Sequence, residues 1–211
     1  MKKLLLFTAF GFACTGLFAQ GQAETYINEA LGHVKAKEYK AAQLSLQDAI
    51  NEINSFIAQE VLNQLPAEIN GLKAQVGDDQ SNSAGMVFMG GGTAITRKYE
   101  GANSSNNAEV NIVANSPLVG TMTALMGNPM MGNSANQKSI RVGTRRAMLK
   151  KEIESEYDEN NNEKQVTNFE LQVILGQTLV TVKGRGFETE QAFTAFYQKI
   201  DFEKIAKTLG E

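Results

Sequence analysis

Pro66 divides the sequence into two parts with different hydrophobic patterns. Over residues 23–65 there is no proline and only one glycine, and apolar residues recur at helical spacing. The members of this pattern are Ile27, Ala30, Leu31, Val34, Ala42, Leu46, Ala49, Ile50, Ile53, Ile57 and Val61. The charged pair Lys37-Glu38 interrupts it, and Pro66 cannot continue a helix. We therefore predict two antiparallel helices, a helical hairpin over residues 20–65 that packs on its own domain.

Part of this hairpin resembles a known repeat. The segment Glu38-Tyr39-Lys40-Ala41-Ala42, with Leu46 and Ala49 after it, resembles the second helix of a tetratricopeptide repeat. The likeness covers about half of one repeat, and no further unit follows at the ~34-residue period. Because solenoids generally need three or more units to close a core, we interpret the segment as a lone hairpin, with a repeat module as the alternative.

After Pro66 the pattern changes to that of short strands separated by turn residues. The predicted strands, in chain order, are 69–76, 93–99, 108–114, two short ones on either side of Gly143-Thr144, and a strong hairpin of 166–175 and 179–183 around Gly176-Gln177. In 93–99, Ile95, Arg97 and Tyr99 alternate with more polar residues, which is typical of a half-buried strand. Consecutive strands with tight turns indicate an antiparallel sheet.

Two further helical segments are predicted in this second part. Ser116-Pro117 is a typical helix start, with serine as N-cap and proline at the first helical position, and Gly127-Asn128-Pro129 would end that helix. The C-terminal segment is helical again, with Asp201 as a cap. We therefore predict the α+β fold class, in which the hairpin is followed by an antiparallel sheet of about six to seven strands covered by helices, over residues 66–211.

The first nineteen residues have the layout of a secretory signal peptide. A cationic start, Lys2-Lys3, precedes fifteen apolar or small residues, which are too few for a membrane helix of ~20 residues. We expect cleavage after Ala19, or after Ala23 as a second choice, and export to the periplasm. Cys14 leaves an alternative open, in which this cysteine is acylated and the protein is lipid-anchored to the envelope.

Rare residues restrict the chemistry of the chain. It has one Cys, one His and no Trp, and the cysteine lies inside the predicted signal peptide. Thiol catalysis, zinc sites and Ser-His-Asp triads need more than the lone His33. We therefore expect no enzyme activity, no metal site and no cofactor.

Charge and hydropathy restrict the partners. The formal net charge is −3, and removing residues 1–19 leaves 18 basic against 23 acidic residues, a net charge of −5. This acidic balance argues against nucleic acid as a partner. No second stretch reaches transmembrane length, so we expect a soluble chain with no transmembrane span after signal removal.

One run of basic residues is the candidate contact for an anion or a partner. It consists of Lys138, Arg141, Arg145, Arg146, Lys150 and Lys151, and acidic residues follow closely. Guanidinium groups near a turn can hold a carboxylate or phosphate, which makes Arg141, Arg145, Arg146 and Lys150 the candidate residues. Strand alternation, however, sends Arg145 and Arg146 to opposite faces. We therefore favour pairing of the run with its acidic neighbours.

Three other motifs are weaker. Gly90-Gly91-Gly92 lacks the lysine of a phosphate loop and leads into a strand, so we predict a plain turn. The segment 158–169 begins like a calcium loop but has Glu163 in place of the turning glycine and Phe169 in place of the last carboxylate, so we predict a solvated hairpin loop. Methionines are dense, and we expect Met122 and Met126 in the core and Met130 and Met131 in a semi-exposed loop that offers a partner surface.

The sequence also resembles a family. The stretch Gly90-Gly91-Gly92-Thr93, Arg97-Lys98-Tyr99, Val110 to Leu118 and Asn128-Pro129 looks like that of a group of uncharacterised exported bacterial proteins of Bacteroidetes or proteobacterial type. Those chains similarly end around an Ile-Asp-Phe, here Ile200-Asp201-Phe202. The layout is similar to the Mog1/PsbP-like α/β sandwich, and that resemblance implies a binding or assembly module.

Together these observations favour a binding protein over a catalyst. We expect an exported, soluble, non-enzymatic binding or assembly module of the cell envelope, whose partner is another envelope protein. An envelope lipoprotein acylated at Cys14 with the same role is one alternative. An anion-binding or carboxylate-based enzyme that uses the basic run 138–151 is the other.

Overall fold

The structure is a computed structural model that describes residues 15–82, 93–102, 106–116, 118–127, 136–157 and 162–211. The chain forms two compact units, Met1–Ile57 and Ala58–Glu211, and each is treated by itself below. The described part of the first unit is named the helical hairpin, and the second unit is named the sheet domain. The division falls inside one long helix.

The predicted helical pair is confirmed. Helix α1 (Thr15–Lys35) and helix α2 (Tyr39–Gln64) are joined by a three-residue connection, in which Lys37 adopts a left-handed φ of 62°. The connection is closed by a backbone hydrogen bond from Glu38 N to His33 O at 2.8 Å and by the contact of His33 Nδ1 with Glu38 Oε2 at 2.7 Å. The lone histidine is therefore engaged in the turn between the helices. Packing of the hairpin on its own domain stays a prediction.

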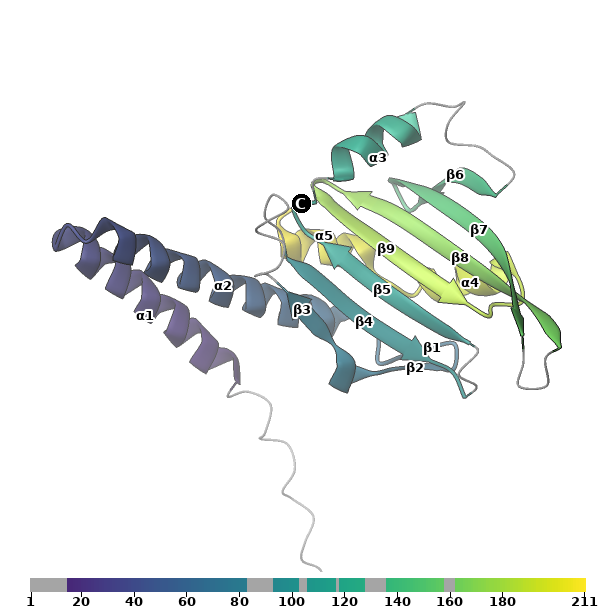
Figure 1. The fold of residues 1–211 in the computed structure, drawn as a ribbon, viewed down its shortest axis with the longest axis horizontal. Helices are drawn as coiled ribbons and strands as arrows, with labels where there is room; N and C mark the ends of the chain where they lie inside the picture. Colours follow the sequence, from purple (N-terminus) through teal and green to yellow (C-terminus); the bar gives the residue numbers. More distant parts are fainter. Residues whose placement is uncertain (1–14, 83–92, 103–105, 117, 128–135, 158–161) are drawn as a thin grey trace, which may run out of the picture. The chain divides into compact units, whose positions relative to one another are not determined.

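The described residues of the sheet domain form one antiparallel sheet, which confirms the predicted α+β class. In spatial order its strands are β1, β2, β4, β5, β9, β8, β7 and β6, with β3 also beside β4 (Figure 1). Their bounds are β1 Glu68–Ile69, β2 Leu72–Ala74, β3 Gln80–Asn82, β4 Ala94–Glu100, β5 Asn107–Val113, β6 Gln137–Val142, β7 Arg145–Tyr157, β8 Glu163–Leu175 and β9 Thr178–Arg185. The nine strands exceed the predicted six to seven.

Two local features account for the additional strands. The predicted strand 69–76 is interrupted, because Asn70 and Gly71 both adopt positive φ and turn the chain between β1 and β2. Strand β3 is entirely polar, and its alternation therefore carried no hydrophobic signal, yet it pairs with β4. Strand β7 is also longer than expected, since it stays paired with β8 as far as Tyr157 and Glu163.

Helices α4 (Glu190–Tyr197) and α5 (Phe202–Leu209) cover one face of the sheet, as Figure 1 shows. Asp201 caps α5 as predicted, its Oδ1 accepting from Lys204 N at 2.9 Å. Between α4 and the sheet lies an aromatic cluster in which Phe193 stacks on Phe169 at a centroid distance of 5.3 Å. The cluster is completed by Phe187, Phe196, Tyr197 and Tyr99. All of these side chains are buried, and they form the core.

Gly184 of β9 makes room for this cluster. A Cβ atom at this position would lie 2.6 Å from Phe193 Cδ2 and 2.7 Å from Phe187 Cε2. Such distances are too short for real contacts, so a larger residue would displace the rings. The glycine at position 184 is therefore required by the packing of these rings.

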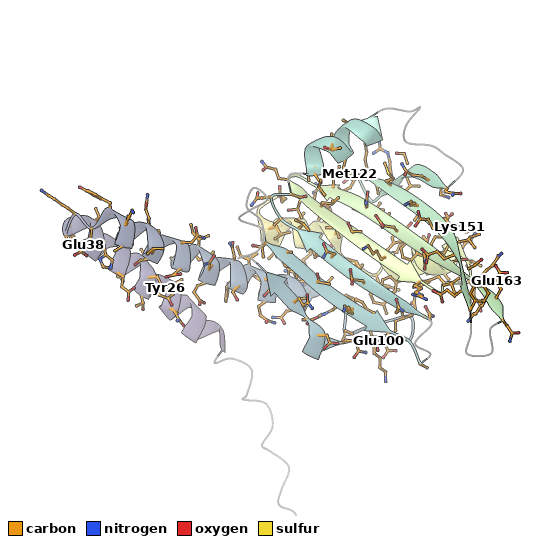
Figure 2. The ribbon with its side chains drawn as sticks, in the orientation of Figure 1. Tyr26, Glu38, Glu100, Met122, Lys151 and Glu163 are labelled. Atoms are coloured by element: carbon orange, nitrogen blue, oxygen red, sulfur yellow. The ribbon has the colours of Figure 1, made fainter. Side chains whose placement is uncertain are left out.

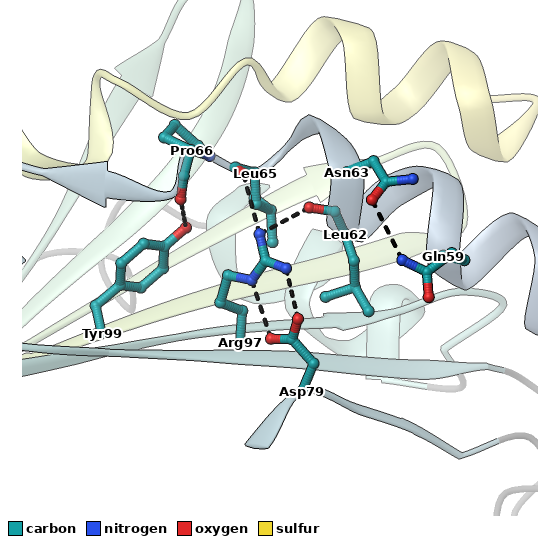
Figure 3. Close-up of polar contacts among 8 residues, drawn as sticks. All are labelled: Gln59, Leu62, Asn63, Leu65, Pro66, Asp79, Arg97 and Tyr99. Atoms are coloured by element: carbon teal, nitrogen blue, oxygen red, sulfur yellow. Dashed lines mark hydrogen bonds and ion pairs between the residues drawn. The ribbon is translucent and has the colours of Figure 1, made fainter. Parts of the chain in front are cut away.

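Arg97, a buried arginine of β4, forms hydrogen bonds with the C-terminal end of α2 within the sheet domain (Figure 3). Arg97 Nε and Nη2 donate to the two carboxylate oxygens of Asp79 at 2.9 and 2.5 Å. Its Nη1 donates to the carbonyl oxygens of Leu62 and Leu65 at 2.8 and 3.0 Å. The carbonyl oxygen of Leu62 also accepts from Leu65 N at 3.1 Å, so Arg97 supplies a second donor there and a donor to Leu65 O, and its charge complements the helix dipole. The hydrogen bond with Asp79 raises the pKa of Arg97.

Tyr99 lies two residues further along β4, and its burial should make the stability of the sheet domain depend on alkaline pH. Its Oη donates to the carbonyl oxygen of Pro66 at 2.9 Å, and burial raises its pKa to about 12. A group whose pKa is higher in the folded state stabilises the fold fully below its unfolded pKa of ~10, and this stability is lost as pH rises through about 12. We expect the free energy of unfolding to fall across this range by up to ~3 kcal/mol on account of Tyr99.

The measurement compares urea unfolding of the wild type and Tyr99→Phe between about pH 9 and pH 12. Because phenylalanine does not titrate, the pH slope of the variant should be shallower in this window, whereas below about pH 9 the two slopes should agree. Identical slopes throughout would contradict the prediction.

Candidate functional site

The sheet face that turns away from α4 and α5, named here the open face, is polar. In β5, strand alternation places Ala108, Val110 and Ile112 on the helix-covered side and Asn107, Glu109 and Asn111 on this one. Register places five charged residues side by side across adjacent strands, in the order Lys98, Glu109, Lys183, Glu170 and Lys150. Charges therefore alternate in sign along the row, and each cross-strand neighbour is of opposite charge.

A surface cavity of ≈ 330 Å³, named here the polar hollow, lies on this face. Its lining is Asn107, Glu109, Lys150, Glu152, Asn168, Phe169, Glu170, Lys183, Gly184 and Arg185, from four neighbouring strands. Phe169, the one aromatic residue of this lining, is only 2% exposed and belongs to the core. The hollow thus presents ammonium, guanidinium, carboxylate and amide groups, and it offers no ring for stacking a sugar or a base.

Hydrogen bonds hold part of this lining in place. Lys150 Nζ contacts Glu152 Oε1 at 2.5 Å, and this hydrogen bond raises the pKa of Lys150. Gln172 Nε2 donates to Glu170 Oε1 at 2.5 Å, and Arg185 pairs with Glu156. Within the described part of the chain, the buried Oδ1 atom of Asn168 accepts no hydrogen bond. An amide acceptor of this kind can be satisfied by a donor on a ligand.

A second, smaller cavity adjoins the first on the open face. It has a volume of ≈ 210 Å³ and is lined by Met122, Gln137, Met148, Lys150, Glu170 and Gln172. Met122 belongs to α3 (Leu118–Gly127), the helix that begins at the predicted cap, where Ser116 Oγ accepts from Leu118 N at 3.3 Å. Figures 1 and 2 show this helix at one end of the sheet, with Met122 next to the strands. This methionine hollow adds an apolar subsite beside the polar one.

The composition of the open face limits its ligands. Its charges are mixed and nearly balanced, whereas a polyanion such as nucleic acid requires a cationic surface. Among the described residues no group of three or more His, Cys, Asp and Glu side chains is placed to hold a metal ion. In the same part of the chain, no helix combines the length and the hydropathy of a membrane span.

The predicted basic run is divided between the two faces. Arg145 lies on the helix side, where its Nε and Nη2 donate to the carboxylate of Glu203 on α5 at 3.0 and 2.9 Å. This hydrogen bond raises the pKa of Arg145 and lowers that of Glu203. Lys138 pairs with Glu190 of α4 at 2.6 Å. The partners of both residues are therefore helix carboxylates rather than the acidic segment that follows the run.

The other two arginines lie opposite each other in the register, on the open side of the hairpin of β6 and β7. Arg141 donates to the carbonyl oxygen of Thr144 at 3.4 Å, and Arg146 is exposed. Neither residue lines either of the two hollows, and only Lys150 of the four candidates does so. The structure thus brings Lys150 to the candidate site and separates Arg145 from it. Met130 and Met131, the turn 90–92 and most of the loop 158–162 lie outside the described residues.

Several lining residues were missed by sequence reasoning. Glu109 and Lys183 stand on strands that were predicted, and Arg185 lies beyond the predicted end of β9 at 183. The three come together only because β9 lies between β5 and β8. Alternation alone could have placed each of them on a polar face. It could not have shown which polar faces are adjacent.

Comparisons of this chain with protein-family models, with curated proteins and with solved structures give no match. The resemblance to exported bacterial proteins therefore stays a prediction.

Proposed function

We propose that the protein is an exported, non-enzymatic binding module of the cell envelope, and that it holds a partner protein on the open face of its sheet. The partner segment would place an apolar side chain against Met122 and Met148 and polar groups over the polar hollow. The observation that carries the proposal is the pair of adjoining hollows on the sheet face that α3 contacts through β7 and β9. Binding sites of proteins combine apolar and polar subsites in this way.

Affinity purification from the envelope, with crosslinking, tests the proposal through matched charge reversals. Lys183→Glu would place three acidic groups in succession across β5, β9 and β8, since Lys183 lies between Glu109 and Glu170. We expect this variant to recover the partner at least ~10-fold less than the wild type, because a like-charge juxtaposition in an interface is unfavourable.

Lys199→Glu is the control, because Lys199 is an exposed lysine between α4 and α5 and the charge change is the same. It should recover the partner as the wild type does. Equal recovery by both variants, or no partner enriched over a mock purification, would overturn the proposed site.

The intact mass of the purified protein distinguishes the lipoprotein alternative from a free exported protein. A purified protein that begins at Gln20 would lack Cys14 and so exclude acylation there, whereas a mass with two or three acyl chains on an N-terminal Cys14 would support the anchored form.

A further inference from the structure

The helical hairpin buries small side chains and exposes large ones. Where α1 and α2 meet, the buried residues are Ala30, Ala42, Ser45 and Ala49. In contrast, the large apolar residues are about half exposed, among them Ile27 at 47%, Leu31 at 52% and Ile50 at 49%. Small residues allow the two helices to approach closely, but two helices alone cannot cover larger side chains. An apolar surface of this kind marks an interaction site.

Most of these exposed residues form one stripe on each helix, and Leu44 and Phe56 of α2 lie outside it. On α1 the stripe is Ile27, Leu31 and Val34, at positions i, i+4 and i+7. On α2 it consists of the exposed Leu46, Ile50 and Ile53 and the partly buried Ile57, at i, i+4, i+7 and i+11. Residues with this spacing lie within an arc of roughly 60° on a helix, so each stripe is continuous.

The two stripes lie on the same side of the hairpin. Successive residues are rotated by about 100° around a helix. On each helix the stripe therefore lies roughly 80° from the buried side. When each helix is viewed from its own N-terminus, the rotation from the buried side to the stripe has the same direction on both. The helices α1 and α2 run in opposite directions, and their buried sides face each other. The same direction of rotation on both helices therefore brings the two stripes to the same side of the hairpin. The seven residues of the two stripes are named here the hairpin face.

The charges around the hairpin face complement a second copy of the same surface. On α2 the neighbouring positions are uncharged amides, such as Gln43, Gln47 and Asn54, which do not repel one another. On α1 the stripe is bounded by Glu24 at one end and Lys35 at the other, and both are exposed. If two α1 helices pack antiparallel about a twofold axis, Glu24 of each copy lies opposite Lys35 of the other.

We propose that the hairpin face binds the hairpin face of a second copy, which forms a four-helix bundle and a dimer of the protein. In this arrangement α1 packs antiparallel on α1 of the second copy, and α2 on its α2. The same seven apolar residues supply both sides of the interface, as twofold symmetry requires, and the bundle covers the side chains that the hairpin alone exposes. The inference does not depend on the proposed function of the open face.

Sedimentation equilibrium of the protein purified after full-length expression tests this proposal. We expect the wild type to show a monomer–dimer equilibrium with a dimer at concentrations of about 10–100 μM. Ile50→Glu should raise the dimer dissociation constant at least ~10-fold, because each dimer carries the buried charge twice.

Leu44→Glu is the matched control. Leu44 is 68% exposed on the same helix but lies far round the helix from the stripe, so this variant should dimerise as the wild type does. Far-UV circular dichroism should show the same helix content for both variants.

Charge exchange tests the antiparallel arrangement and identifies the occupant. Glu24→Lys and Lys35→Glu should each weaken the dimer, and the double variant should restore it, because both pairs across the twofold axis are then reversed. A monomer at all concentrations would overturn the proposal, as would a dimer that Ile50→Glu leaves unchanged. Cosedimentation of a monomeric wild type with phosphatidylglycerol–phosphatidylethanolamine vesicles, lost in Ile50→Glu, would assign the face to a lipid surface instead.

Discussion

Replacing Arg97 with methionine should lower the free energy of unfolding of the sheet domain by about 3–5 kcal/mol. The side chain of Arg97 is only 6% exposed and that of Asp79 only 12%, so the substitution leaves a carboxylate with little access to water and no cation. It also removes the donor to the carbonyl oxygen of Leu65 and one of the two donors to that of Leu62. Both losses act in the same direction, because each leaves a polar group unpaired.

Urea unfolding followed by near-ultraviolet circular dichroism measures the effect. Arg97→Lys should fall between the wild type and Arg97→Met, because an ammonium keeps the charge but cannot match the planar carboxylate and both carbonyls at once. Lys98→Met is the control, since Lys98 is exposed on the other face of the same strand, and it should stay within ~0.5 kcal/mol of the wild type. Equal midpoints for Arg97→Met and Lys98→Met would refute the role of the buried pair.

The second large effect is expected at Phe193. This residue is fully buried and contacts three other rings, those of Phe169, Phe187 and Tyr197, at centroid distances of 5.3, 5.4 and 5.5 Å. Phe193→Ala should therefore cost about 3–5 kcal/mol in the free energy of unfolding, because the cavity left behind can close only in part. The same urea experiment applies, with Gln191→Ala on the exposed side of α4 as the control.

Gly184 provides a coupled test of the same contact. Gly184→Ala should cost about 1–3 kcal/mol, because its Cβ would meet the Phe193 ring. In a Phe193→Leu background that cost should shrink, since the aromatic ring of Phe193 is gone and the contact with Phe187 Cε2 remains. Strictly additive costs would show that Phe193 is not what confines residue 184.

How much of this could be predicted depends on the range of the interactions. Local patterns predicted β4, β5, β8 and β9, the caps at Ser116 and Asp201, and the helical pair, because alternation and capping need only neighbouring residues. The same alternation placed Arg97 on the face of Ile95 and Tyr99, and that placement is correct. Its partners were unpredictable, since the polar segment around Asp79 has no hydrophobic periodicity and the carbonyls of Leu62 and Leu65 carry no side-chain signal.

In the candidate site, too, local features were predictable and long-range contacts were not. Alternation predicted correctly that Arg145 and Arg146 diverge, but the carboxylate that binds Arg145 belongs to α5, far along the chain. The polar hollow depends on the strand order, which places Lys183 between Glu109 and Glu170. Strand order is decided by the packing of the whole sheet on α4 and α5, and no single segment encodes it.

The position of β9 also bears on the order in which the chain can fold during synthesis. The sheet consists of an early half, β1 to β5, and a later half, β6 to β8, and β9 joins them through its pairing with β5 and β8. Helices α4 and α5, which supply Phe193, Phe196 and Ile205 to the core, are synthesised later still. Until residues beyond 178 are made, neither half can close its hydrophobic face. The sheet domain of a nascent chain therefore stays unfolded until its last strand is made, which is the state in which a protein that we propose to be exported would have to cross a membrane.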